Sequence, residues 1–345
     1  MTFLDTLNKY HVDGLLYKQT HPTLPLTIWN YAPEVQYSGN WDDITVMCRG
    51  LVTDDEGNIV ARPFKKFWNL EENRHNPTKE FQVFAKLDGS LGILFYYEGE
   101  WIFASRGSFT SEQSTKGFEM LKKNVDDTNI FNKEYTYLFE IIYNENRVVV
   151  RYPFENVVLL SAIHTHSGIE MSYDAILAYS YIIPIVSRYD GLKDISKLKS
   201  IIKDDEEGFV ILFSNGERMK VKGEEYLRLH KVMTNLSTTA VWEVLSSGGS
   251  MESLLVDVPD EFYNKIKEYE TKLRYQYYII AETAGKYFDS YYENCDGNLP
   301  DKATYAKWVL TKDKYLRHIL FKLYDNRSDY SAYIWKLIKP KFEKL

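Results

Sequence analysis

The sequence has few cysteines and no long hydrophobic run. Cys48 and Cys295 lie far apart in a chain of 345 residues, and no CxxC pair occurs. This excludes a disulfide framework and favours a reducing compartment. No stretch approaches 18 consecutive apolar residues, and the N-terminal MTFLDTLNKYHVDGLL has no apolar core. We therefore expect no membrane span and no signal peptide, which favours a cytoplasmic protein.

An overall positive charge is also absent. The formal net charge of −7 argues against binding nucleic acid through the overall field of the chain. The charge is uneven, however, because residues 301–345 contain eleven Lys and Arg against five Asp and Glu. Either a solvated helix surface or a surface that faces phosphates explains this excess. Its last lysines are Lys336, Lys339, Lys341 and Lys344.

Short strands dominate residues 44–222. Hydrophobic residues make up 44% of the chain, enough for packed cores in two domains. ITVMCRGLVTDDEGNIVARPF and GFVILFSNGERMKVKG alternate and break at turn residues, so each predicts a hairpin. YTYLFEIIY and NRVVVRY predict another strand pair, and FQVFAKLDGSLGILFYYEGEWIFASRGS predicts three strands joined by two turns.

Helical spacing replaces this pattern after about residue 224. Apolar residues recur at helical spacing in EEYLRLHKVM, DKATYAKWVL and YLRHILFKLY. SSGGSMES, residues 246–253, is the most linker-like break, and it either joins the domains or separates two helices. We predict an α+β fold in which a domain of antiparallel sheets, residues 1–236, precedes an all-helical domain, residues 237–345.

Lys86 interrupts an apolar stretch, FQVFAKLDGSLGILF. One interpretation is structural: Asp88 and Gly89 form a hairpin turn, and the lysine points to solvent from a strand. The other interpretation is chemical: an amine attacks phosphorus only when it is neutral, and an apolar surrounding or adjacent cations favour the neutral form. KxDG alone is too short to decide between the two.

The charged residues that follow favour the chemical interpretation. Glu140 lies inside the apolar strand YLFEII, and Glu207 opens EEGFVILF. Isolated carboxylates on strands call for a metal, a hydroxyl donor or a basic partner. Lys220 and Lys222 are two apart in RMKVKG and hence on one face of a strand. An anion such as a triphosphate would relieve their repulsion.

The order KxDG, strand Glu, EG-hydrophobic and KxK resembles the motif series of the covalent nucleotidyltransferases, which include ATP-dependent ligases and mRNA capping guanylyltransferases. Within that superfamily the chain most closely resembles the phage-type RNA ligase 1 family. CRGLVT, ARPFKKFWNLEEN, SRGSFTSEQ and FEIIYNENRVVV also look like that family's pattern. The resemblance covers roughly residues 27–235 and implies a nucleotidyltransferase (adenylyltransferase) domain. Over the helical C-terminus it rests on architecture.

The resemblance implies an ATP-dependent RNA ligase. Lys86 would attack the α-phosphate of ATP and form lysyl-AMP, AMP would pass to the 5′-phosphate of an RNA end, and an RNA 3′-hydroxyl would then displace AMP. ATP and Mg²⁺ (or Mn²⁺) are the implied cofactors and RNA the implied partner, with the C-terminal helices as candidates for RNA docking. No protein partner is implied. Repair of cleaved tRNA in a host cytoplasm is the role expected of a phage-encoded member.

The same resemblance implies roles for the cations. Arg49 and Lys66 would hold the β- and γ-phosphates and orient pyrophosphate as the leaving group. Lys220 and Lys222 would contact the α-phosphate and its neighbours. Fixed cations and Mg²⁺ together offset the charge that accumulates on the α-phosphate during attack by Lys86.

Roles for the acidic and loop residues are implied as well. Glu140 resembles the residue that binds the ribose or a metal-bound water, and Glu207 resembles a metal-site carboxylate. Asp88 and Gly89 would shape the loop that carries the nucleophile.

The sequence departs from the family pattern at three places. Leu87, between the lysine and the aspartate of KxDG, stands where an acidic residue is expected in close relatives. Trp29, with Tyr31 nearby, stands where a triphosphate-binding tyrosine is expected. Only Glu252 remains of an acidic pair expected early in the helical domain.

Three other functions stay open on the sequence alone. A DNA ligase or a capping guanylyltransferase would add a small OB-type β-barrel after KxK, and the helical spacing there argues against one. A non-catalytic RNA-binding protein with a degenerate site is disfavoured because all the charged motif residues are present. A β-rich module with accidental motifs is disfavoured by the number of independent matches.

Overall fold

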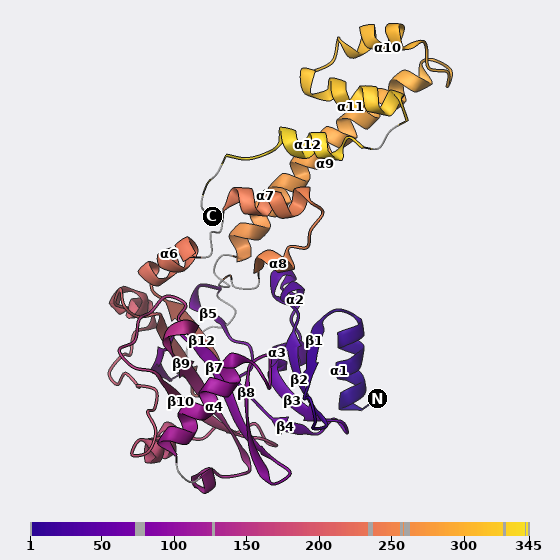
Figure 1. The fold of residues 1–345 in the computed structure, drawn as a ribbon. Helices are drawn as coiled ribbons and strands as arrows, with labels where there is room; N and C mark the ends of the chain where they lie inside the picture. The colour runs from indigo at the N-terminus through magenta and orange to yellow at the C-terminus, as the bar shows by residue number, and fades with distance from the viewer. Residues whose placement is uncertain are drawn as a thin grey trace. The chain divides into compact units, whose positions relative to one another are not determined.

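The computed structural model describes residues 2–72, 80–125, 128–233, 237–255, 258, 263–326, 329–341 and 343. The chain divides into two compact units, residues 1–230 and 231–345, which are described separately here. The division falls inside helix α6 (Glu224–Met233), whereas the sequence placed it between residues 236 and 237. The first unit combines antiparallel strands with helices, and the second is helical (Figure 1). The predicted α+β class is therefore confirmed.

The described part of the first unit contains three four-stranded sheets. The N-terminal sheet consists, in spatial order, of β1 (Leu16–Thr20), β2 (Leu26–Tyr31), β3 (Arg49–Asp54) and β4 (Ile59–Ala61). The β9 sheet consists of β10 (Asn156–His164), β9 (Tyr135–Ile142), β7 (Ser90–Tyr97) and β8 (Glu100–Ser105). The β11 sheet consists of β5 (Trp68–Asn69), β12 (Arg218–Lys222), β11 (Gly208–Phe213) and β6 (Phe81–Lys86). All these pairings are antiparallel except β5 with β12, which is parallel.

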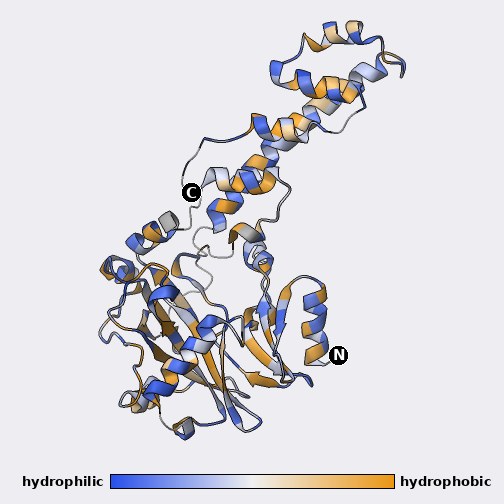
Figure 2. Cartoon of the chain, in the orientation of Figure 1, coloured by the Kyte–Doolittle hydropathy of each residue, from blue (hydrophilic) through white to orange (hydrophobic). Residues whose placement is uncertain are grey.

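Helices surround the sheets of the first unit. The α-helices before α6 are α1 (Phe3–Val12), α2 (Pro33–Ser38), α3 (Asp43–Met47), α4 (Glu112–Asn124) and α5 (Tyr173–Ile176). The 3₁₀ helices are η1 (Leu70–Glu72), η2 (Thr128–Ile130), η3 (Asn144–Asn146), η4 (Leu177–Tyr179) and η5 (Ile195–Ile201). The longest of the α-helices, α4, packs on β8 and β10 of the β9 sheet. Figure 2 shows the hydrophilic residues of α4 and hydrophobic residues on the strands beneath it.

Both faces of the β9 sheet are buried. Phe139 belongs to the core that the sheet forms with Leu121 of α4. Its neighbour Leu138 faces the opposite way and belongs to a core shared with Ile28 and Val52 of the N-terminal sheet. Successive strand residues point to opposite faces, and this explains why YLFEII is an apolar run without alternation. Glu140 lies on the Leu138 face and brings a carboxylate to the edge of that core.

The predicted hairpin at Asp88 and Gly89 is wrong. β6 pairs with β11, whereas β7 pairs with β8 and β9, so residues 87–89 carry the chain from one sheet into another. The other two hairpins are confirmed, because β3 pairs with β4 and β11 pairs with β12. Lys86 is therefore the last residue of β6, at the point where the chain leaves the β11 sheet.

The predicted strand NRVVVRY is also wrong. Residues 147–151 form no strand, and β9 pairs with β10 instead. The physical reason is that the amides of Val149 and Val150 donate to the carboxylate of Asp88, each at 2.7 Å, rather than to a neighbouring strand. Three consecutive valines thus serve a loop that holds a buried acid.

The second unit is helical throughout its described residues. Its helices are α7 (Thr238–Ser246), α8 (Glu252–Leu255), α9 (Tyr263–Glu293), α10 (Lys302–Val309), α11 (Lys314–Tyr324) and α12 (Ser331–Leu337). SSGGSMES separates α7 from α8, which was one of the two alternatives. Tyr305, Leu316 and Ile334 are fully buried in its core. None of the helices in the described ranges has the length and apolar character needed to cross a membrane.

Candidate active site

The β11 sheet presents its charged residues on one face. Paired residues on neighbouring strands share a face, and every second residue along a strand returns to it. Three rows of such residues cross the sheet: Lys86–Gly208–Lys222, then Phe84–Val210–Lys220, then Gln82–Leu212–Arg218. Lys86 and the KxK lysines were predicted to act together, and the register places them within two rows of one another.

Lys86 forms an ion pair with Glu207. The Lys86 Nζ lies 2.9 Å from Glu207 Oε1, and the Lys222 Nζ lies 3.4 Å from the same oxygen. The Glu207 side chain is only 4% exposed. Burial would raise the pKa of Glu207, but Lys86, Lys222 and Lys220 outweigh it and hold that pKa below its usual value. Glu207 is therefore ionised and compensates the lysines around it.

Glu140 faces the same group of charges from β9. Glu140 is half-buried at the cavity wall, and desolvation raises its pKa to about 8. Lys86 opposes the rise, whereas the neighbouring carboxylates of Glu207 and Asp88 add to it. Two carboxylates with opposite pKa shifts thus lie near one lysine, and Glu140 is largely protonated at neutral pH in this arrangement.

Asp88 is a buried anchor for the Lys86 loop. Its carboxylate accepts the amides of Val149 and Val150 and, at 3.0 Å, the hydroxyl of Tyr226. Its own amide donates to the Tyr152 hydroxyl at 2.8 Å. Desolvation and the charge of Glu207 raise the pKa of Asp88, and these hydrogen bonds oppose the rise. The sequence suggested a loop-shaping role for Asp88 but gave no sign of its four partners.

Gly89 lies at the end of the loop, where the chain enters the β9 sheet. A Cβ atom built at this position would meet the carbonyl oxygen of Ile141 at 2.5 Å and the Cγ of Glu140 at 3.1 Å. A larger residue would push the loop away from β9. Glycine therefore brings the Lys86 loop close to Glu140.

Arg49 and Lys66 differ in their relation to Lys86. Arg49 lines the same cavity as Lys86, and its charge acts on Glu140. Lys66 is buried with its ammonium 5.4 Å from the centre of the Trp41 ring, and it does not line that cavity. Arg49, Lys86 and Glu140 thus share the lining of one cavity, whereas Lys66 is buried outside that lining.

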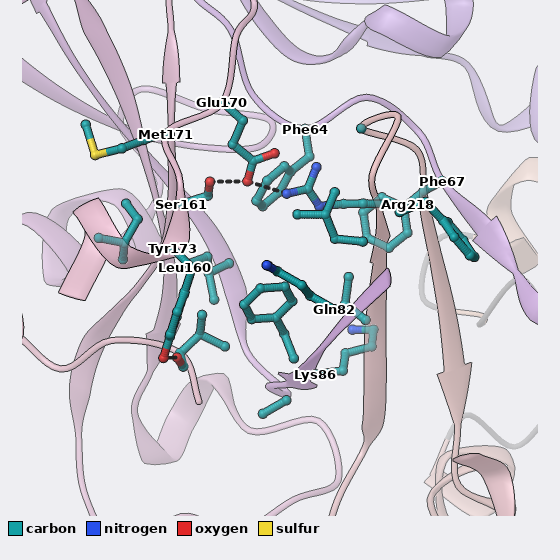
Figure 3. A pocket seen from close by; sticks show the side chains of 18 of the residues that line it. Phe64, Phe67, Gln82, Lys86, Leu160, Ser161, Glu170, Met171, Tyr173 and Arg218 are labelled. Carbon is teal, nitrogen blue, oxygen red and sulfur yellow. Dashed lines mark hydrogen bonds and ion pairs between the residues drawn. The ribbon is translucent and has the colours of Figure 1, made fainter. Parts of the chain in front are cut away.

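A cavity of about 790 Å³ extends from Lys86 between the β11 and β9 sheets. Its size falls in the range of small-molecule sites. Phe84, Phe64 and Tyr173 contribute aromatic surface, and Lys86, Arg49 and Glu140 contribute charge. Figure 3 shows this cavity with Lys86 and Tyr173 among its labelled side chains. A flat aromatic ligand group and an anionic group would both find complementary walls here.

Leu87 lines this cavity, whereas Trp29 and Tyr31, at another departure from the family pattern, do not. Trp29 is 1% exposed and donates its indole N–H to Thr53 at 2.9 Å, so it is a core residue. Tyr31 packs edge-on against Trp41, with ring centres 4.9 Å apart. Glu252 is exposed on α8 of the second unit. Within the described residues no group of three or more His, Cys, Asp or Glu is arranged to hold a metal ion.

The C-terminal lysines lie in the second unit. Lys336, Lys339 and Lys341 are exposed, and Lys339 lies 4.6 Å over the Trp242 ring. The backbone carbonyl of Lys341 accepts from the Thr238 hydroxyl at 2.8 Å, which ties residue 341 to the start of α7. Lys344 lies outside the described residues.

Comparison with known proteins identifies the family. A family model described as RNA ligase matches residues 47–236, more than half of the chain. The chain belongs to this RNA ligase family, the phage-type RNA ligase 1 family that the motif series predicted.

Relatives carry related descriptions. The chain is 25% identical over 245 residues to a putative bifunctional polynucleotide kinase/RNA ligase of Autographa californica nuclear polyhedrosis virus, covering 63% of this chain and 35% of that one. It is 24% identical to an RNA ligase of Rhodothermus phage RM378, covering 66% and 70%. A putative RNA ligase of Thermovibrio ammonificans is 27% identical, with 54% of each chain covered. The chain thus spans about a third of the first relative and about half of the last.

Among solved structures, an archaeal ATP-dependent RNA ligase and a putative ATP-dependent DNA ligase from Aquifex aeolicus are also similar to this chain. The first has a TM-score of 0.49 at 14% identity, covering 79% of this chain and 70% of that one. The second has a TM-score of 0.48 at 14% identity, covering 95% and 89%.

Proposed function

We propose that this chain is an ATP-dependent RNA ligase that joins 5′-phosphate and 3′-hydroxyl ends through a lysyl-AMP intermediate on Lys86. The observation that carries the proposal is the position of Lys86. It ends a strand at the wall of a cavity and pairs with a buried carboxylate that Lys222, on the same face of the sheet, also contacts. Membership in the RNA ligase family supports the reaction type.

The first step forms a bond between Lys86 Nζ and the α-phosphorus of ATP. The bond from that phosphorus to the oxygen between the α- and β-phosphates breaks, and pyrophosphate leaves with that oxygen. The Lys86 nitrogen keeps one hydrogen and releases the others to pyrophosphate and solvent. AMP then passes from the lysine to the 5′-phosphate of an RNA end. In the last step the 3′-hydroxyl attacks that phosphate, a phosphodiester forms, and AMP is released.

The ion pair with Glu207 sets a condition on the first step. The ion pair with Glu207 at 2.9 Å occupies the Lys86 Nζ, the atom that has to reach the phosphorus. Lys222 lies 3.4 Å from the same carboxylate oxygen. We therefore propose that attack requires Lys86 to leave Glu207, with Lys222 remaining as the partner of this acid.

The residues present fit a divalent cation that is held largely through phosphate. Mg²⁺ is typically bound by one or two carboxylates together with substrate phosphates and waters. Glu207 supplies an ionised carboxylate beside Lys86, and Glu140 supplies a second whose charged form any nearby cation would favour. When bound, Mg²⁺ (or Mn²⁺) would offset charge on the α-phosphate. Lys220 and Lys222 of β12 would also offset the charge on the α-phosphate, and Arg49 would orient the pyrophosphate.

RNA is the proposed polymer substrate, and the exposed lysines of the second unit are candidates for its docking. Their charge should make RNA affinity fall with rising salt. Cleaved tRNA is a natural substrate to compare with unstructured RNA. A DNA ligase or capping enzyme remains the alternative, disfavoured because the described residues after β12 form helices instead of a β-barrel.

The test is incubation with Mg²⁺ and ATP labelled at the α-phosphate. We expect acid-labile, covalent AMP on the wild type and none on Lys86→Ala. Lys123→Ala, a change at an exposed lysine of α4, is the matched control and should label normally. Equal labelling of the Lys86→Ala variant would contradict the mechanism. Labelling with GTP in place of ATP would indicate a capping enzyme, and sealing of DNA but not RNA would indicate a DNA ligase.

A further inference from the structure

A second polar cluster lines the cavity that contains Lys86. Glu170 accepts hydrogen bonds through one oxygen, Oε1, from the Ser161 hydroxyl and from the Arg218 guanidinium. Ser161 is 2% exposed, and the guanidinium carbon of Arg218 lies 4.4 Å from the centre of the Phe64 ring. Figure 3 shows these side chains at the cavity wall, with both contacts drawn. The cluster contains none of the residues that the motif series singled out.

The cluster keeps hydrogen-bonding capacity that the described part of the chain does not use. Among the described residues, none donates to the second carboxylate oxygen of Glu170, and none accepts from Nε or Nη1 of Arg218. The carboxylate can only accept and the guanidinium can only donate. An acceptor beside a donor complements a ligand edge with a donor beside an acceptor. The amino group and ring nitrogen of adenine form such an edge.

The register of the β11 sheet sets the distance of this cluster from the nucleophile. Arg218 lies two rows from Lys86 and four residues from Lys222 along β12. At about 3.3 Å per residue along a strand and about 4.8 Å between strands, the backbones of Lys86 and Arg218 are roughly 16 Å apart, which leaves room for a nucleoside monophosphate between their side chains. Phe84 occupies the row between them and packs edge-on with Tyr173, with ring centres 5.4 Å apart. The intervening wall is therefore aromatic, as suits a base.

We propose that Glu170, oriented by Ser161 and Arg218, accepts the amino group of the nucleotide base and makes the site selective for adenine. Arg218 donates to the adjacent ring nitrogen. A 6-oxo base such as guanine would place a carbonyl oxygen against the carboxylate, and neither group could donate. This inference rests on the proposed function, because it takes the α-phosphate to lie at Lys86.

A purely structural ion pair makes different predictions. Glu170 follows β10 and Arg218 begins β12, so the pair also links two sheets. If that link were its whole role, removing it would weaken all nucleotides equally and lower thermal stability. A base-reading role instead changes the preference between nucleotides that differ only in the base edge.

The experiment measures binding and adenylylation with three nucleotides: ATP, GTP and purine riboside triphosphate, which lacks the 6-amino group. Dissociation constants are measured by calorimetry on the Lys86→Ala variant with Mg²⁺, and KM and kcat of covalent labelling on the intact chain. With Glu170 present, ATP should bind at least about tenfold more tightly than purine riboside triphosphate, because the loss of the amino group leaves a charged acceptor unpaired. The Glu170→Gln variant should lose most of this preference, with KM for ATP raised and kcat nearly unchanged.

Asp190→Asn is the matched control. Asp190 also pairs with an arginine, Arg188, at 2.8 Å, but it does not line the cavity. It should leave the nucleotide preference unchanged. Ser161→Ala, a small change at a buried site, should reduce the preference by a few-fold and tests the inference should Glu170→Gln fold poorly.

The outcomes separate this inference from the proposed function. Equal binding of ATP and purine riboside triphosphate by the chain with Glu170 intact would overturn base reading, as would a preference retained in Glu170→Gln. Loss of all three nucleotides together with a lower Tm would assign the pair a structural role only, and would also overturn it. Selective ATP binding without any covalent label on the wild type would instead refute the proposed ligase chemistry.

Discussion

Two cation–carboxylate pairs lie two rows apart along the β11 sheet, beside a cavity that Lys86, Glu170 and Arg218 line, and they are built differently. We call them the Lys86 end and the Glu170 end. Glu207 at the Lys86 end has two lysines at its oxygen and is almost completely buried. Glu170 at the other end has one arginine and a serine, and its side chain is 22% exposed. The Lys86–Glu207 pair joins the end of β6 to the residue that precedes β11, within one sheet. The Glu170–Arg218 pair joins the loop after β10 to β12 of the β11 sheet. The Lys86 end is thus a crowded group of charges suited to chemistry, and the Glu170 end a sparse one suited to recognition.

The largest effect should come from Glu207→Gln. The change leaves Lys86 and Lys222 close together without their shared anion, which should lower the free energy of unfolding by about 3 kcal/mol. Covalent AMP labelling should fall by at least about 100-fold, because a fixed charge beside the reacting groups is lost. Urea denaturation and the labelling assay measure the two effects.

Glu206→Gln is the control for that change. Glu206 is the preceding residue, and it pairs with Lys203 at 3.6 Å at the surface. Surface pairs contribute little, so we expect a change below about 1 kcal/mol and normal labelling. Comparable losses in both variants would mean that the Lys86 end has no special electrostatic role.

The second prediction is a pH dependence that arises at the Lys86 end alone. The folded pKa of Glu140 is about 8, above its value in the unfolded chain, so the folded state holds a proton that the unfolded state has lost. Stability should therefore fall as pH rises from about 5 to 8, by at most about 1.4 kcal/mol per pH unit, and level off above the folded pKa. Denaturation in EDTA at several pH values measures the slope.

Two variants assign that slope. Glu140→Gln removes the titrating group, so its stability should vary less with pH over this range. Glu170→Gln leaves the Lys86 end intact and should keep the wild-type slope. A slope that survives in Glu140→Gln would mean that another group carries the coupling.

The contrast between the ends also explains what could be predicted from sequence. Lys86, Glu207 and Lys222 were predicted because their positions follow strand patterns and a known motif order. The Glu170–Arg218 contact joins residues 48 apart that belong to no motif, and only the packing of two sheets brings them together. The positions of strands are easier to predict from a sequence than the pairs of sheets that pack against each other.

The errors have the same origin. The turn at Asp88 and the strand at 147–151 were inferred from local composition. In the fold, the two segments bind each other, and the valine amides satisfy the aspartate. Tertiary hydrogen bonds thus overrode the β propensity of consecutive valines. The α+β class and the helical C-terminus were predictable because they rest on periodicity over long stretches.

The smallest predicted effect tests whether the hydrogen bonds to Asp88 help to position Lys86. Tyr226→Phe removes the hydroxyl that donates to Asp88 at 3.0 Å, leaving the two valine amides in place. Loss of one buried hydrogen bond to a charged acceptor should cost about 1.5 kcal/mol of stability. Labelling should slow by only a few-fold, through kcat rather than KM, if the loop that carries Lys86 becomes less well ordered.

Tyr189→Phe is the matched control, because Tyr189 packs on Phe209 of the same sheet and does not contact Asp88. It should leave kcat unchanged. If Tyr226→Phe lowers stability yet labels at the wild-type rate, Asp88 serves the fold alone and the Lys86 loop needs no help from α6. If kcat falls in Tyr226→Phe but not in Tyr189→Phe, the helix that follows the KxK lysines helps to hold the nucleophile. The loop that carries Lys86 would then depend on hydrogen bonds from two segments, residues 149–152 and α6.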